Sequence, residues 1–117
     1  MTDPLRTLGM PPELMSQGQP LSAIGSRDLA WPRAAALEIL QRVRARGIAV
    51  LGGDVVQLDG DRPRRTRDNW HSEPAHAEPF AAFVERSVAE SEAYIRDFRE
   101  AGPGYFYVLI LAERLPR

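Results

Sequence analysis

Residues 47–71 constrain the fold more than any other part of the chain, because a turn signal divides them into two segments that can pair. The first segment, residues 48–58, is rich in isoleucine, valine and leucine, which favours a β-strand. Asp59-Gly60-Asp61 follows, and an Asp-Gly pair supplies the positive φ that a hairpin turn needs. The stretch therefore predicts an antiparallel hairpin whose second strand runs from about Arg62 to Trp70.

Glycine and proline predict irregularities in this hairpin. Gly52-Gly53 interrupts the first strand, and two glycines inside a strand indicate a β-bulge or a close backbone approach. Pro63 has no N–H to donate to a ladder. We therefore expect the second strand to start late or to run at an edge of the sheet.

A helical pattern leads into the hairpin and another leads out of it. Apolar residues recur at three- and four-residue steps over residues 32–46, and Gly47 is the stop signal. A second amphipathic pattern runs over residues 79–101 and ends at Gly102-Pro103-Gly104. Residues 105–111 are almost continuously apolar, which predicts a central strand buried on both faces.

The expected fold is a small single α+β domain with an antiparallel or mixed sheet of three to four strands and two main helices packed on it. The fourth strand would be residues 28–31, because Trp31 precedes a proline and so prefers extended geometry. With that strand the element order is ferredoxin-like, and without it a three-stranded sheet remains. We expect the domain to cover residues 11–113, after a flexible lead at 1–10 and before a tail at 114–117.

Composition excludes several classes of protein. The 117 residues suit one domain, and the net charge of −1 argues against a surface that binds nucleic acid or anionic membrane as a whole. The absence of cysteine excludes thiolate metal sites and thiol nucleophiles, and the absence of lysine excludes Schiff-base and P-loop chemistry. The N-terminus carries no secretory signal and no segment could span a membrane, so we expect a cytoplasmic protein without a cofactor.

The hairpin also contains the residues best suited to binding a partner. Arg62, Arg64, Arg65 and Arg67 lie next to Trp70, and basic residues interleaved with an aromatic can grip single-stranded nucleic acid. Aspartates on both sides dilute this charge, so a solvated hairpin of mixed charge is the simpler interpretation. Trp70 follows polar residues suited to a turn or loop, so of the two tryptophans it is the one that we expect to be partly exposed.

Catalytic and metal sites find little support. Asp54 and Asp68 could face each other across the hairpin as an acid–base pair, but two carboxylates alone are weak support for a hydrolase. His71 and His76 have no defined geometry in a loop that contains a proline, so we predict no metal site. We predict that the protein is not an enzyme.

Several short motifs resemble the immunity protein 40 family of bacterial polymorphic toxin systems. The strongest are Leu51-Gly52-Gly53-Asp54-Val55 and Asp68-Asn69-Trp70. Shorter matches, in the same order as in the family, are Pro12-Glu13-Leu14, Ile24-Gly25, Phe83-Val84, Ala93-Tyr94-Ile95 and Tyr105-Phe106. The resemblance covers roughly residues 11–112, and Arg67 departs from it by standing where the family pattern has an aromatic residue.

The resemblance implies a protein that binds and neutralises a cognate protein toxin by stoichiometric occlusion. The candidate toxin-binding residues are Asp54, Arg64, Arg65, Arg67, Asp68, Asn69 and Trp70. A local alternative for Asp54, Asp68 and Asn69 is that they are bulge and turn residues bonded to their own backbone. The competing function is a small nucleic-acid- or ligand-binding module that uses residues 62–70. The oligomeric state is left open.

Overall fold

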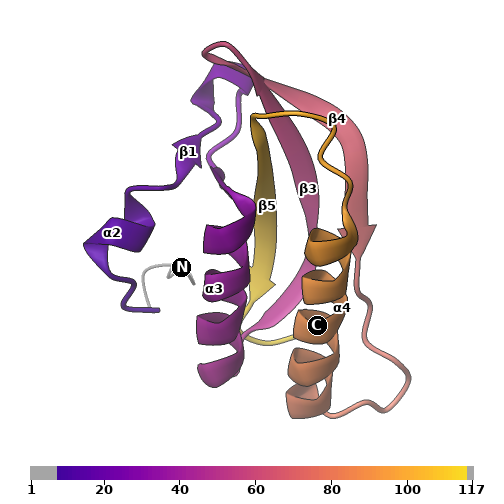
Figure 1. The fold of residues 1–117 in the computed structure, drawn as a ribbon. Helices are drawn as coiled ribbons and strands as arrows, with labels where there is room; N and C mark the ends of the chain where they lie inside the picture. The colour runs from indigo at the N-terminus through magenta and orange to yellow at the C-terminus, as the bar shows by residue number, and fades with distance from the viewer. Residues whose placement is uncertain (1–7, 116–117) are drawn as a thin grey trace.

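The computed structural model describes residues 8–115 and shows a five-stranded sheet with two long helices side by side on one face (Figure 1). The elements are α2 (Pro12–Met15), β1 (Gln19–Pro20), the 3-10 helix η1 (Ser22–Ile24), β2 (Leu29–Trp31), α3 (Arg33–Ala45), β3 (Ala49–Asp59), β4 (Arg62–His71), α4 (Phe80–Asp97) and β5 (Tyr105–Ala112). No helix within residues 8–115 is long and apolar enough to cross a membrane.

The strands lie in the order β1-β2-β5-β3-β4, and every pairing is antiparallel. The expected fourth strand is confirmed as β2. The expected number of three to four strands is wrong, because β1 adds a fifth. Along the chain, the elements from β2 to β5 follow the expected strand–helix–strand–strand–helix–strand order, and β1 precedes them. This agreement concerns the order of the elements along the chain and not their arrangement in the sheet.

The hairpin of β3 and β4 is confirmed. Gly60 adopts φ +64° in the turn, and Asp59 pairs with Arg62. The expected bulge at the glycine pair is present, since the pairing of β3 with β5 shifts register between Val50 and Gly52. β4 forms the edge of the sheet, as the proline predicted.

The second helix is shorter than expected. α4 ends at Asp97, and Phe98 is extended at φ −63°, ψ 126°, so the predicted end near residue 101 is wrong. Arg33, at the start of α3, donates from Nε to the carbonyl of Ile95 at 3.1 Å and from Nη2 to the carbonyl of Phe98. This guanidinium satisfies carbonyls that a longer helix would have bonded, and a cation suits the helix C-terminus.

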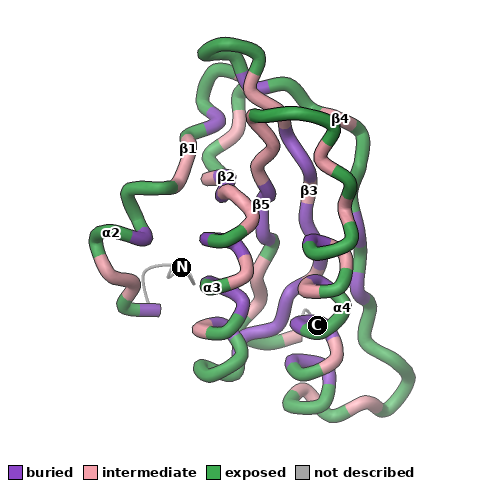
Figure 2. The backbone as a smooth tube through the Cα atoms, viewed as in Figure 1, coloured by how far each residue is buried: buried purple, intermediate pink, exposed green. Residues whose placement is uncertain are grey.

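The main core lies between the sheet and the two helices, where Figure 2 shows buried residues along β3, β5 and the inner sides of α3 and α4. Its largest fully buried side chains include Trp31, Tyr107, Ile39 and Leu40. Leu8 is also buried there, at 2% exposed. Met10, also in the predicted flexible lead, packs against this core. Residues 1–7 of that lead and residues 116–117 lie outside the described residues.

A smaller cluster occupies the other face of the sheet. Trp31 and Tyr107 pair with each other and belong to the core under the helices, so the adjacent pair Ala30 and Val108 points the other way. Leu21, beside η1, covers this second pair. The prediction that the last strand is buried on both faces holds only for its middle, because Ile110 is 43% exposed.

Candidate partner-binding surface

The seven predicted toxin-binding residues all lie on the β3–β4 hairpin, but the sheet divides them between its two faces. Asp54 pairs with Asn69 on one side and with Val108 on the other, so all three side chains point away from the helices. Asp68 and Trp70 point towards α4, since Trp70 bonds to that helix and the two residues are two positions apart.

We call the face away from α3 and α4 the open face. The alternation of side chains along the strands places Asp54, Arg65, Asn69, His71 and Ile110 on this face. Asp54 is half-buried and the other four are exposed. Ile110 was missed from the sequence because an apolar run gives no sign of which residue the fold leaves uncovered.

Trp70 is buried, so the prediction of partial exposure is wrong. It is 7% exposed, and its indole Nε1–H donates to Ser91 Oγ at 3.0 Å. The ring stacks on Tyr94 with centroids 4.6 Å apart and covers Gly53, where an added Cβ would lie 2.3 Å from the indole. Trp70 therefore acts on any partner only by positioning its neighbours.

A second bulge shapes the exposed strand. Arg65 pairs with Val56 and Asn69 with Asp54, so three residues of β4, 66–68, lie opposite the single residue Val55. Arg67 takes φ +74° inside this bulge. The bulge therefore makes the edge strand irregular at Arg67, which is exposed.

Side chains hold the bulge in shape. Thr66 Oγ1 donates to the carbonyl of Val55 at 2.9 Å and accepts the N–H of Asp68 at 3.1 Å. Asn69 Nδ2 donates to the carbonyl of Arg67 at 3.1 Å, so the local backbone role holds for Asn69. Asp54 and Asp68 have no side-chain hydrogen bond or ion pair with the described residues, so that local role does not explain them.

The arginines of β4 are exposed, as a solvated hairpin requires. Arg62, Arg65 and Arg67 reach solvent, and Arg64 donates to Gln57 Oε1 at 2.5 Å. A grip on single-stranded nucleic acid needs an aromatic platform beside such arginines. The burial of Trp70 removes that platform.

Asp54 and Asp68 do not form an acid–base pair. Asp54 lies on the open face and Asp68 on the helix side, so the idea that they face each other across the hairpin is wrong. Among the described residues, no group of three or more histidine, cysteine or acidic side chains is placed to hold a metal ion.

An ordered loop borders the hairpin. Arg86 on α4 donates to both carboxylate oxygens of Glu78, at 2.8 and 3.0 Å, and Glu78 also accepts the N–H of Ala75. The hydrogen bond from Arg86 is the main cause that lowers the pKa of Glu78 to about 2. Ser72 Oγ donates to Glu90 at 2.7 Å. These contacts fix the segment after β4 to α4.

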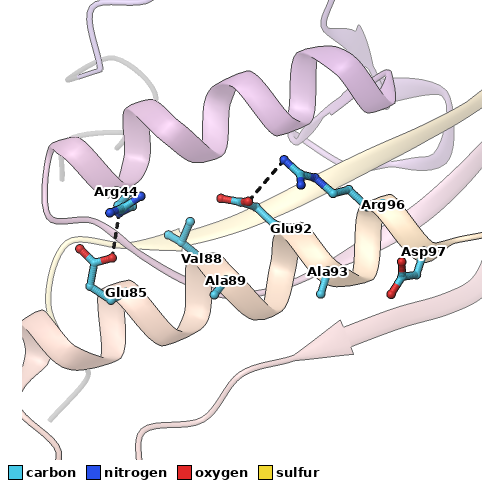
Figure 3. A pocket seen from close by; sticks show the side chains of 8 residues that line it. All are labelled: Arg44, Glu85, Val88, Ala89, Glu92, Ala93, Arg96 and Asp97. Atoms are coloured by element: carbon cyan, nitrogen blue, oxygen red, sulfur yellow. Dashed lines mark ion pairs between the residues drawn. The ribbon is translucent and has the colours of Figure 1, made fainter.

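A hollow of about 470 Å³ lies between α3 and α4 (Figure 3). Its charges are largely paired, since Arg44 contacts Glu85 at 2.8 Å and Arg96 contacts Glu92 at 3.7 Å. These are mutually satisfied surface ion pairs and leave little charge for a ligand.

A comparison with known protein families gave a match over most of the chain. The family described as Immunity protein 40 matches residues 20–111. This range includes both long helices and all five strands except Gln19 in β1 and Ala112 in β5. Neither the curated proteins nor the solved structures gave a match. The matched region is most of the chain, and on that ground the chain belongs to the immunity protein 40 family.

Proposed function

We propose that this protein is a non-enzymatic immunity protein that neutralises a cognate bacterial toxin by one-to-one occlusion, with the β3–β4 hairpin in the interface. The observation that carries the proposal is membership of the immunity protein 40 family over residues 20–111. The partner is the C-terminal toxin domain of a polymorphic toxin, and the complex forms in the cytoplasm.

The hairpin supports this role by its chemistry. Arg65 and Arg67 are exposed, and arginine is among the residues most enriched at binding hot spots. Asp54 and Asp68 leave their carboxylates available, because neither has an ion pair with a described residue. The bulge bonds made by Thr66 and Asn69 preorganise this surface, which lowers the entropy cost of binding.

Two observations favour a protein partner over nucleic acid or membrane. The net charge is −1, so the chain as a whole does not attract a polyanion. Trp70 stacks inside the domain and is not available to stack on a base.

The first experiment is co-expression with the polypeptide encoded next to this protein. Survival of the host together with a one-to-one complex on an affinity tag is the expected result. Survival without a complex would replace occlusion by an indirect or enzymatic antidote. If the host does not survive and no complex forms, the immunity role towards that polypeptide is refuted.

Variants of the hairpin then test the surface. Asp54→Asn and Arg65→Glu should each weaken the complex about tenfold, the loss expected when one charged contact is broken. Arg27→Glu is the matched control, since Arg27 is an exposed arginine in the loop before β2. If Arg27→Glu weakens binding as much as Arg65→Glu, the effect comes from net charge and not from the hairpin.

A further inference from the structure

An apolar hollow on the flank of α4 has no role in the fold or in the predicted site. It has a volume of about 450 Å³ and is lined by Glu90, Ala93, Tyr94, Asp97 and Phe98. In Figure 3, Ala93 and Asp97 extend from α4 on the side away from α3. Asp97 and Phe98 form the end of the helix, so the hollow opens where α4 stops.

The floor of the hollow is aromatic and firmly held. Tyr94 stacks on Trp70 at 4.6 Å with an interplanar angle of 27°, and Phe98 lies 6.1 Å from Tyr94 and 5.6 Å from Tyr105. Trp70 is itself fixed by its bond to Ser91. Because Trp70 covers one side of the Tyr94 ring, the remainder of that ring borders the hollow.

The charged residues that line this hollow, Glu90 and Asp97, are both acidic. Asp97 lines the hollow and has no ion pair with a described residue, whereas Glu90 is paired with Arg86 at 3.1 Å. Asp68 lies on the same side of β4 as Trp70 and two residues from it. Its charge helps to raise the pKa of Tyr94, although burial is the larger cause. Asp68 and Asp97, which form no ion pair within residues 8–115, therefore flank an aromatic floor whose lining contains no cation.

We propose that this hollow receives an arginine side chain of the toxin, with its guanidinium on the Tyr94 ring between Asp68 and Asp97. This inference rests on the proposed function and names the chemistry of the partner. A guanidinium stacks on an aromatic face and binds carboxylates through a planar fork of donors. Its methylene stem would lie on Ala93 and Phe98, which suits an apolar wall.

A filled hollow is the sharpest test. Ala93 is exposed and lines the hollow, so Ala93→Arg would place an arginine of this chain in it without burying a new group in the core. Ala89→Arg is the matched control, because Ala89 is exposed one turn earlier and, like Ala93, lines the hollow between the helices, but does not line this one. With the co-purified toxin domain in titration calorimetry, we expect Ala93→Arg to weaken binding at least about tenfold and Ala89→Arg to change it less than about twofold.

Charge removal gives a second readout. Asp97→Asn and Asp68→Asn should each weaken binding about five- to tenfold and reduce its dependence on salt, while Asp61→Asn in the exposed turn should do neither. A double-mutant cycle with exposed arginines of the toxin should give a coupling for one of them with Asp97.

The outcomes separate this inference from the proposed function. Unchanged binding of Ala93→Arg and Asp97→Asn would overturn the arginine site and leave the immunity role standing. Equal losses of toxin binding for Ala93→Arg and Ala89→Arg would also overturn it. A dimer of the free protein that Ala93→Arg dissociates would overturn it too, because a second copy of the chain would then occupy the hollow. No binding by the wild-type protein would overturn both.

Discussion

Replacement of Trp70 should remove much of the free energy of unfolding, because its indole belongs to the core and does not contact a partner. The side chain is 7% exposed, stacks on Tyr94 and donates to Ser91 Oγ at 3.0 Å. A buried tryptophan removes about 200 Å² from water, worth about 5 kcal/mol at about 25 cal/mol per Å². Measured truncations of large aromatic side chains cost about 3–5 kcal/mol. We therefore expect Trp70→Ala to lower the free energy of unfolding by about 4 kcal/mol.

The hydrogen bond can be isolated from this total. Ser91→Ala leaves the indole N–H buried without an acceptor, which costs about 1–3 kcal/mol, although alanine regains a few tenths in helix propensity. In a Trp70→Phe background there is no N–H left to strand, so Ser91→Ala should then be close to neutral. The expected coupling between the two sites is about 1–2 kcal/mol.

Urea unfolding followed by far-ultraviolet circular dichroism measures these values without relying on tryptophan emission. A loss below about 1 kcal/mol for Trp70→Ala would refute its assignment to the core. An equal cost of Ser91→Ala in both backgrounds would refute the indole hydrogen bond. Loss of toxin binding by Trp70→Ala would carry no information about the interface unless the variant is first shown to be folded.

Three further predictions concern single contacts. Gly53→Ala should cost about 3 kcal/mol or more in urea unfolding, because the new Cβ would lie 2.2 Å from the carbonyl oxygen of Val108. Glu78 has a folded-state pKa lowered to about 2 by Arg86, so its stabilising contribution is complete above pH 4.5 and is lost as the pH falls towards 2. Thermal unfolding from pH 7 to pH 2 should therefore show a smaller loss for Glu78→Gln than for the wild type. Arg33→Met should cost about 1–3 kcal/mol and increase hydrogen exchange at the end of α4, because two carbonyls there lose their donor.

Much of the fold followed from local chemistry in the sequence. Asp59-Gly60-Asp61 placed the turn, Pro63 placed β4 at an edge, and the glycine pair at 52–53 placed a bulge. In each case one residue type permits or forbids a backbone conformation, so its position alone carries the prediction. β1 gave no such signal, because Gln19–Pro20 is extended only through its pairing with β2.

The site was harder to predict because residues adjacent in a strand point to opposite faces. Asp68, Asn69 and Trp70 were assigned to one surface, yet Asn69 shares the open face with Asp54 and the other two face α4. The bulge at 66–68 added to the difficulty. In a regular hairpin with this turn Asp68 would lie opposite Gly53, and the bulge places Trp70 there instead. The gap left by glycine is what lets the indole lie flat against β3.

The open face raises the question of whether its polar residues protect the fold or serve the partner. Arginines, proline and a bulge on β4 are the usual means of preventing an edge strand from pairing with another chain, so Arg65 and Arg67 do not by themselves require a binding role. Asp54 is different, because it lies on β3 with a neighbouring strand on each side. Edge protection does not explain it.

Asp54 should therefore cost stability and be retained for binding. Aspartate is disfavoured within strands on a scale that spans about 1 kcal/mol, and this half-buried carboxylate has no ion pair with the described residues in return. Asp54→Thr should raise the free energy of unfolding by about 0.5–1 kcal/mol and weaken the toxin complex, the opposite signs expected of a functional residue. If the substitution instead destabilises the protein and leaves binding unchanged, Asp54 has a structural role in the sheet. The strongest argument that the partner binds the open face would then be refuted.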